Sequence, residues 1–280
     1  MTTTLVTGSR GRVGRTLIGL LHEQGFKVRA ASSEPDELAL PDGVPDVKLS
    51  FADPHTFPDA LAGVGSVFLY ADSSHIEEFI KVANDAGVQH VVLLSSSAVL
   101  GPNAANDPIA RQHLEVEDAL KSSALPCTFL RPGAFASNAL YWSWPLRTTG
   151  ALNLPYPGSH TDAIHESDIA EAALAILKDP SLRGGAYTLT GPDSITFGEQ
   201  VALLSRTTGR QLRVDAVTRD AWKAEVAEYM HGPFADALLD YWQSNDGRPV
   251  DLTHTVEELT GHPARGFAVW AEEYAAEFVR

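Results

Sequence analysis

The sequence predicts an α/β fold, in which a doubly wound parallel sheet is followed by a smaller α+β unit. Between residue 3 and about residue 135, six short apolar runs alternate with longer helical patterns. Each run is apolar on both faces, which is typical of strands buried on both sides in a parallel sheet. The alternation stops after Pro132, and a length of 280 residues fits one large or two unequal units.

The first unit contains six predicted strands, at 5–7, 27–31, 47–51, 66–71, 90–95 and 127–131. Helical patterns cover 13–24, 76–86 and 108–123, with Gly25 and Gly87 placed where glycine commonly ends a helix. Strands that alternate with helices in this way favour a doubly wound sheet.

After Pro132 the elements become shorter and less regular. The sequence predicts an aromatic segment at 136–146, a turn-rich segment at 150–158, a helix over 220–242 and a terminal amphipathic helix over 266–280. Nothing in this half has the composition of a linker. We therefore expect residues 136–280 to form a substrate-binding cap on the sheet unit 1–135, with segments around 160–190 returning to that unit and a cleft between the two.

Composition narrows the classes of partner. The chain carries 36 Asp and Glu against 21 Lys and Arg, a formal net charge of −15 at pH 7. This charge repels phosphate backbones and anionic lipids, so we expect neither nucleic acid nor membrane as a partner. Cys127 is the only cysteine, which excludes an intramolecular disulfide. With no apolar run of signal-peptide or membrane length, we expect a cytoplasmic protein, as a monomer or a homodimer.

A glycine-rich loop lies between the first strand and the first helix. It reads Thr7-Gly8-Ser9-Arg10-Gly11-Arg12-Val13-Gly14. Glycines at such a turn let the backbone approach a pyrophosphate, and the unpaired N–H groups of the helix N-terminus attract that anion. The loop therefore predicts a Rossmann-type domain that binds NAD or NADP.

The end of the second strand bears on the choice between these two cofactors. NAD sites usually place an acid there, whereas this strand ends in Ser32 and Ser33 and the acid, Glu34, comes later. Arg10 and Arg12 offer cationic partners for a 2′-phosphate. NADP is therefore favoured over NAD, although both arginines can equally be solvated loop residues.

Three segments together resemble the NmrA-like family of atypical short-chain dehydrogenases, whose relatives include NAD(P)H:quinone reductases and isoflavone reductase-like proteins. They are TGSRGRVG at residues 7–14, HVVLLSSSAVLG at 90–101 and SSALPCTFLRPGAFASN at 122–138. The resemblance extends nearly from end to end, and it implies a Rossmann domain, a smaller substrate domain and a nicotinamide above the ends of strands four to six.

The resemblance also implies which positions contact the cofactor. They are Gly8, Arg10, Gly11, Arg12, Val13, Gly14, Ser32, Ser33, Ser50, Phe51, Leu69, Tyr70, Ala71, Ser95, His113 and Pro132. Ser33 stands where relatives carry an arginine, and Ser50 where they carry an aspartate. Both departures bear on the choice between NADP and NAD.

The usual catalytic pair of short-chain dehydrogenases, Tyr-x-x-x-Lys, is absent, because Ile109 and His113 stand at the matching positions. A histidine can bind the nicotinamide ribose or act as a general acid, since its ordinary pKa of about 6.5 lies close to working pH. Alternatively, His113 belongs to an apolar helix stripe and is a packed core residue. Ser96 and Ser97 are candidate hydrogen-bond donors to a substrate carbonyl, or ordinary caps at a strand end.

Two further groups of residues have competing interpretations. Aromatic and apolar side chains in the second unit suit a flat conjugated substrate, or form the core of the cap; they are Phe135, Tyr141, Trp142, Tyr229 and Met230. A cluster of possible metal ligands, His160, Asp162, His165, Glu166 and Asp168, immediately precedes a helix. Helix capping by Ser167 or Asp168 accounts for it, so we expect no metal.

The sequence therefore favours an NADP-dependent reductase of a small aromatic, quinone-like or polyketide-type carbonyl or enone compound. A quinone tolerates the missing tyrosine, because its developing oxyanion is a stabilised phenolate. Two alternatives remain: a redox-sensing regulator that binds the dinucleotide without turnover, and a non-redox cyclase or epimerase on the same scaffold.

Overall fold

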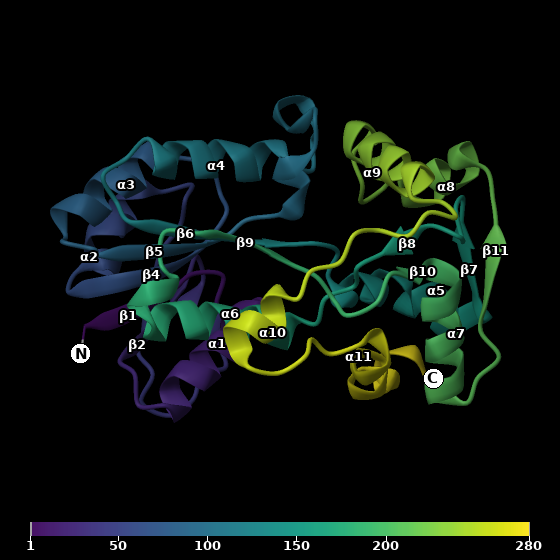
Figure 1. Ribbon diagram of the computed structural model, residues 1–280, viewed down its shortest axis with the longest axis horizontal. Coiled ribbons are helices and arrows are strands. Elements are labelled where there is room, and N and C mark those ends of the chain that lie inside the picture. The colour runs from purple at the N-terminus through teal and green to yellow at the C-terminus, as the bar shows by residue number, and fades with distance from the viewer. Residues whose placement is uncertain (1, 280) are drawn as a thin grey trace.

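The computed structural model describes residues 2–279 and confirms the predicted α/β architecture (Figure 1). A seven-stranded sheet, parallel throughout, runs in the order β3-β2-β1-β4-β5-β6-β9. Its strands are β1 (Thr3–Val6), β2 (Val28–Ser32), β3 (Asp46–Lys48), β4 (Val64–Tyr70), β5 (His90–Leu94), β6 (Cys127–Pro132) and β9 (Ala186–Leu189).

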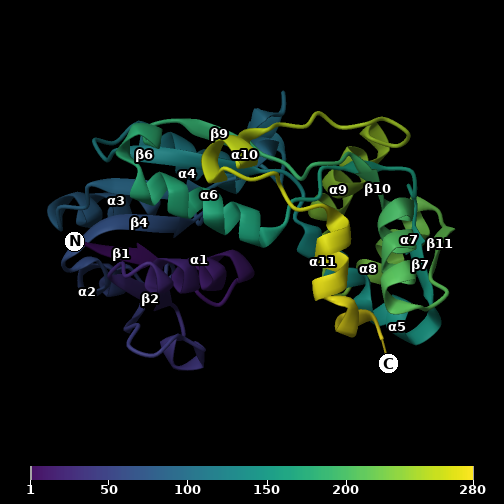
Figure 2. The ribbon, with the colours of Figure 1, turned by 60° about the horizontal axis from the view of Figure 1, so that its bottom comes forward.

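Helices cover both faces of this sheet. One face carries α1 (Arg12–Glu23) and α6 (Glu166–Lys178), and the other carries α2 (Phe57–Leu61), α3 (Ile76–Asp85) and α4 (Arg111–Lys121) (Figure 2). Successive side chains of each strand enter opposite cores. In β4, Val67 and Leu69 pack under α2 and α3, whereas Phe68 packs against α1. The strands are therefore apolar on both faces because each face is buried, as the sequence predicted.

The second unit has its own core and two small sheets. β7 (Ala151–Leu154) pairs with β11 (Arg213–Ala216), and β8 (His160–Thr161) pairs with β10 (Ile195–Thr196). Around them lie α5 (Ser143–Thr149), α7 (Phe197–Thr208), α8 (Arg219–Val226), α9 (Gly232–Ser244) and α11 (Phe267–Glu273). Edge-to-face aromatic contacts hold this core, with the rings of Trp222 and Trp242 5.0 Å apart.

The chain returns to the sheet unit twice after entering the second one. α6 and β9 form the first return, within the segment 160–190. A second return, at α10 (Thr255–Thr260), packs against α6 and buries Val256 in the same core (Figure 1). This later return was not predicted, because a six-residue helix carries little periodic signal.

Several expected elements differ from those observed. The helix expected over 220–242 is broken between α8 and α9. In a continuous helix the Pro233 ring would clash with the carbonyl of the residue four positions earlier, and proline has no N–H to donate to it. The terminal helix ends at Glu273 and continues as a short 3-10 turn. The turn-rich segment 150–158 contains β7, and 136–142 form a 3-10 helix ahead of α5. Within residues 2–279, no helix combines the length and apolar character that crossing a membrane requires.

Candidate active site

The glycine-rich loop wraps closely around the start of α1. Gly8 has a φ of +64°, and its carbonyl accepts a hydrogen bond of 2.9 Å from the Gly11 N–H. A Cβ on Gly14 would lie 2.4 Å from the same carbonyl oxygen, so only glycine fits there. α1 has no side-chain cap and no acid in its first turn. Its first N–H groups and positive dipole end therefore remain open to an anion, which fits a pyrophosphate.

A cleft of about 470 Å³ extends from this loop along the ends of β1, β2 and β4. Many of the predicted cofactor positions line it: Gly8, Arg10, Gly11, Ser32, Ser33, Ser50, Phe51, Tyr70 and Ala71. Val13, Gly14 and Leu69 are instead buried beneath it. Arg12 points elsewhere, with its guanidinium 5.5 Å from the centre of the Tyr274 ring. The structure thus brings nine of the predicted cofactor positions together at this cleft, whereas Arg12, Val13, Gly14 and Leu69 do not line it.

Arg10 is the one Lys or Arg lining this cleft among residues 2–279, and it is already paired. Its guanidinium donates to Glu34 and, at 2.8 Å, to Glu37. These two carboxylates would therefore compete with any 2′-phosphate that reaches Arg10.

Replacing both acids, by Glu34→Gln with Glu37→Gln, is expected to tighten NADPH binding relative to NADH by about threefold to tenfold. The substitution frees Arg10 and removes two negative charges beside the 2′ position. Fluorescence titrations with each cofactor measure the ratio. Asp36→Asn, in the same turn but outside the pairing, is the control and is expected to leave the ratio unchanged. Equal effects on NADH and NADPH would contradict this role for Arg10.

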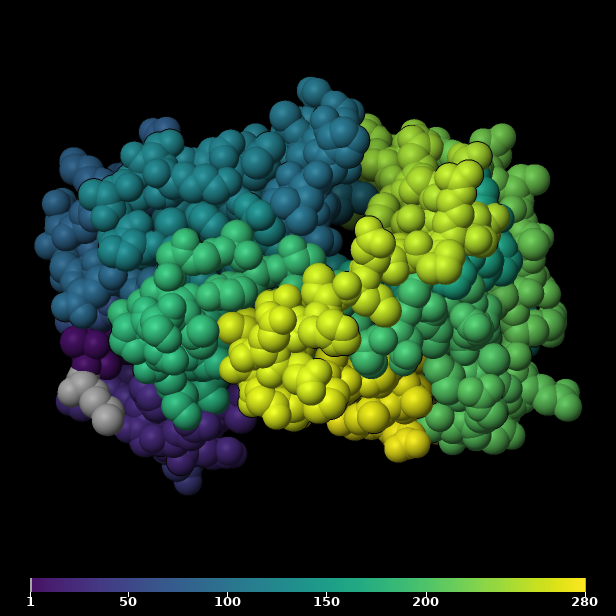
Figure 3. All heavy atoms as spheres, in the orientation of Figure 1, coloured from purple at the N-terminus to yellow at the C-terminus, as the bar shows by residue number. Residues whose placement is uncertain are grey.

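A larger cleft of about 1090 Å³ separates the two units. Its floor is the carboxyl ends of β4, β5 and β6, including Tyr70, Ser95 and Pro132. One wall is the segment 101–109, and the opposite wall is α9; Figure 3 shows the surface hollowed between these parts. Tyr70 lines both this cleft and the smaller one, so the two adjoin.

Ser95 is part of a buried ionic network beneath the large cleft. Its hydroxyl donates to Glu117 at 2.7 Å, and Arg131 donates to the same carboxylate at 2.9 and 2.6 Å. Burial alone would raise the pKa of Glu117, but hydrogen bonds from Arg131, Ser95 and Lys121 hold that pKa below its ordinary value. Because its proton is committed to Glu117, Ser95 presents only acceptor lone pairs to the cleft.

The predicted catalytic residues His113, Ser96 and Ser97 all line the large cleft. His113 lies one helical turn before Glu117 and lines the cleft, and its buried Nδ1 has no hydrogen-bond partner among residues 2–279. Burial lowers the pKa of His113, so its ring is neutral at pH 7. The Ser96 oxygen accepts from the Ala98 N–H, the capping arrangement considered from the sequence. The neutral imidazole and the hydroxyls of Ser96 and Ser97 can therefore donate hydrogen bonds but carry no positive charge.

Of the five predicted substrate residues, only Phe135 lines the large cleft. Trp142 packs edge-to-face on Phe197 inside the cap core, and Met230 packs against that core. Tyr141 and Tyr229 are 80% and 68% exposed and lie outside the cleft lining. For Trp142 and Met230 the structure thus favours the core interpretation.

α9 contributes a wall that was not predicted from the sequence. Phe234, Leu238 and Tyr241 all line the cleft. Their spacing of four and three residues places them on one helix face, a signal that is present in the sequence. The predicted substrate residues Tyr229 and Met230 fall instead in the break before α9.

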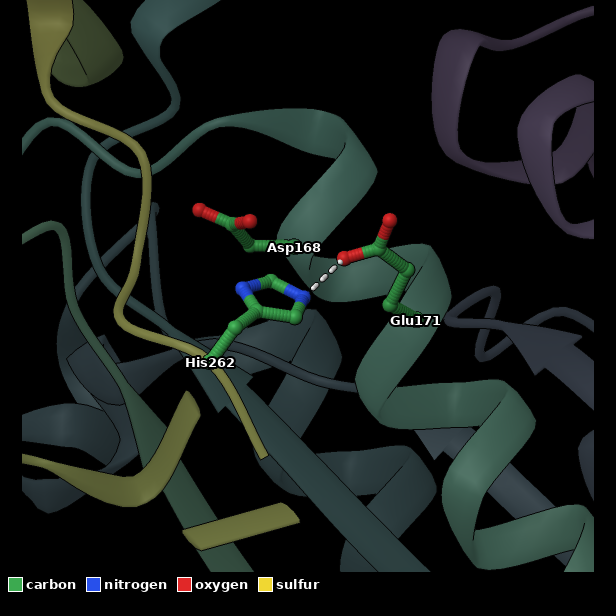
Figure 4. A group of neighbouring side chains, drawn as sticks. All are labelled: Asp168, Glu171 and His262. Atoms are coloured by element: carbon green, nitrogen blue, oxygen red, sulfur yellow. Dashed lines mark hydrogen bonds and ion pairs between the residues drawn. The ribbon is translucent and has the colours of Figure 1, made fainter. Parts of the chain in front are cut away.

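Residues of the possible metal cluster take part in helix capping and in ion pairs within the protein. His165, not Ser167 or Asp168, caps α6, with its Nδ1 accepting from the Ser167 N–H. Asp168, Glu171 and His262 do approach one another (Figure 4). Arg265 donates to both of these carboxylates, and His262 lies 2.8 Å from Glu171. This cluster ties the segment before α11 to α6.

Comparison with known proteins adds independent information. A sequence model of the NmrA-like family matches residues 1–262. The chain is 37% identical to a (4-alkanoyl-5-oxo-2,5-dihydrofuran-3-yl)methyl phosphate reductase of Streptomyces griseus, over 98% of each chain. It is 31% identical to an NAD(P)H azoreductase of Xenophilus azovorans, also over 98% of each.

Among solved structures, the fold is similar to that of an NADPH-dependent quinone oxidoreductase from Escherichia coli complexed with NADPH. The TM-score is 0.81 with 22% identity, covering 96% of this chain and 99% of that one. At 22% identity, this similarity shows a shared fold and nothing about the reaction.

Proposed function

Because this chain belongs to the NmrA-like family, we propose that it is an NAD(P)H-dependent reductase of small carbonyl, quinone or enone compounds. The observation that carries the proposal is the meeting of the two clefts at Tyr70, above the carboxyl ends of β4 to β6. Ligands of doubly wound sheets bind at this edge. One cleft fits the dinucleotide, and the other has room for a second small molecule beside it.

The residues that would hold the cofactor are those of the glycine loop and the smaller cleft. Gly8, Gly11 and the start of α1 would receive the pyrophosphate, and Ser32 and Phe51 would line the adenosine side. When bound, the nicotinamide supplies a hydride. NADP remains the favoured cofactor on the sequence argument, with Arg10 as the cation for its 2′-phosphate.

The chain's own contribution is positioning and hydrogen bonding. Ser96 and His113 line the large cleft and would donate to the oxygen of a substrate carbonyl, where negative charge develops. A quinone or a conjugated enone needs little acid assistance, since its oxyanion is delocalised. This requirement is consistent with the absence of a tyrosine at position 109. The names of the two relatives, which reduce a conjugated lactone and an azo compound, support a conjugated substrate.

The test is to follow oxidation of NADPH and NADH in the presence of quinones and enones. We expect turnover of at least one conjugated compound. If the protein binds the dinucleotide and oxidises none of the panel, it is better described as a redox-sensing regulator, and the proposal is wrong.

Replacing His113 by alanine is expected to lower kcat/KM about tenfold to a hundredfold, since a positioned donor is lost. His113→Gln keeps a donor and should retain most of the activity. Steady-state kinetics of quinone reduction measure catalysis, and titration with NADPH measures cofactor binding. Together they separate loss of catalysis from loss of cofactor binding. The control is His254→Ala, on an exposed residue outside both clefts. If the alanine variant at position 113 keeps full kcat/KM, His113 is a packing residue.

A further inference from the structure

We propose that the large cleft takes uncharged carbonyl compounds and rejects their phosphate esters. This inference rests on the proposed function and narrows its substrate class. Among residues 2–279, no lysine or arginine lines this cleft. The charged side chains that do line it are carboxylates, at Asp107, Asp236 and Asp240. A phosphate monoester, which carries about −1.5 to −2 charges at pH 7, would enter without a cation to receive it.

Two cations are bound to the carboxylates of this wall. Lys223 lies 2.6 Å from Asp236, and Arg219 lies 2.6 Å from Asp240. Both cations belong to α8, and neither lines the cleft. They offset the charge of α9 without presenting a free donor to a ligand.

The helix N-termini at the cleft offer few N–H groups to an anion. Pro233 is the second residue of α9 and has no N–H, which removes one of the first donors of that helix. Ahead of α4, the Asp107 carboxylate accepts the Ile109 N–H at 2.8 Å, which places a negative charge where a phosphate would bind. His113 stays neutral for the reason given above. The polar donors of the cleft therefore suit a carbonyl oxygen rather than a dianion.

Much of the remaining lining is apolar, beside neutral polar side chains such as Asn103, Asn106 and Asn138. Phe135, Phe234, Leu238 and Ile109 offer surface for a flat or alkyl-substituted molecule. Transferring a phosphate from water to such a surface is unfavourable unless cations or N–H groups replace its hydration. In this respect the cleft does not match the phosphorylated substrate named for the Streptomyces griseus relative.

The experiment compares matched pairs of compounds that differ only in the phosphate. One pair is a 4-alkanoyl-5-oxo-2,5-dihydrofuran-3-yl methanol and its phosphate ester, and another is a hydroxyalkyl naphthoquinone and its phosphate ester. We expect kcat/KM with NADPH to favour each alcohol by at least about tenfold. The preference should shrink as salt rises, because screening weakens repulsion between charges but not a steric clash. A preference for either phosphate, or a ratio that salt leaves unchanged, overturns the inference.

A variant tests the stated cause. Asp236→Asn releases Lys223 from its carboxylate and is expected to reduce the preference for the alcohols about threefold or more. Asp215→Asn removes the same charge from β11, away from the cleft, and should leave the preference as it is. An equal change in both variants would show that net charge, not the cleft, sets the ratio.

Binding separates this inference from the proposed function. If no compound is reduced, the proposed reductase activity fails for these compounds. Calorimetric titration of each pair into the complex with NADP⁺ still ranks the two members. Tighter binding of the alcohols supports the inference, and tighter binding of the phosphates, or no binding by any compound, contradicts it.

Discussion

Replacing Arg131 by methionine is expected to lower the free energy of unfolding by about 3–5 kcal/mol, because a fully buried carboxylate loses its main partner. The Glu117 side chain is 0% exposed and accepts hydrogen bonds from Ser95 and from two nitrogens of Arg131. The remaining cation, Lys121, is 3.0 Å away but 43% exposed, so it cannot replace Arg131. Urea unfolding followed by circular dichroism measures the loss.

Two further variants isolate the cause of that loss. Combining Arg131→Met with Glu117→Leu removes both charges and should recover most of the stability, since an apolar pair can replace a buried ion pair. Lys121→Met, which removes the exposed partner alone, should cost at most about 1 kcal/mol. If the double variant is no more stable than Arg131→Met, the network is not what the single substitution disturbs.

Replacing Gly14 by valine is expected to weaken NADPH binding by at least about a hundredfold, or about 2.7 kcal/mol. The new Cβ would lie 2.4 Å from the Gly8 carbonyl oxygen and 3.2 Å from the Ser9 Cα. Both contacts are backbone, so the glycine loop must move away from α1 and its N–H groups can no longer receive the pyrophosphate together. Fluorescence titration with NADPH measures the effect.

Gly19→Ala is the matched control, because it lies on the same helix and its added Cβ would meet nothing within 4 Å. It should bind NADPH as the wild type does and gain slightly in stability, through the higher helix propensity of alanine. Circular dichroism shows whether the Gly14→Val protein is folded. A folded Gly14→Val protein with wild-type affinity would mean that the dinucleotide does not bind this loop.

The sequence was most informative where the signal is local. The alternation of apolar runs predicted six of the seven strands of the main sheet, and the order of strand, glycines and helix predicted the loop around Gly8. β9 lies in the segment 160–190 that was expected to return to this unit, but its bounds were not predicted because a four-residue strand carries little periodic signal. The cap was less predictable, since its elements are short and Pro233 divides what reads as one helix.

The candidate site depends on pairings that periodicity does not report. Ser95, Glu117 and Arg131 come from a strand end, a helix and the next strand, and only the folded sheet brings them together. Arg10 reads as a free cation in the sequence but is paired with acids more than 20 residues away. The wall on α9 was detectable in the sequence, whereas the positions of Trp142 and Met230 depend on how the cap core packs.

The repeated crossing of the chain between its two halves has a consequence for how the protein can be divided. The segment 1–135 lacks β9, which completes the sheet beside β6, and it lacks α6 and α10, which cover the apolar face next to α1. Expressed by itself, it would present an unpaired strand edge and a bare hydrophobic surface, both of which promote aggregation. A single proteolytic cut near residue 135 is therefore expected to leave a fragment that aggregates, so the two halves depend on each other to fold.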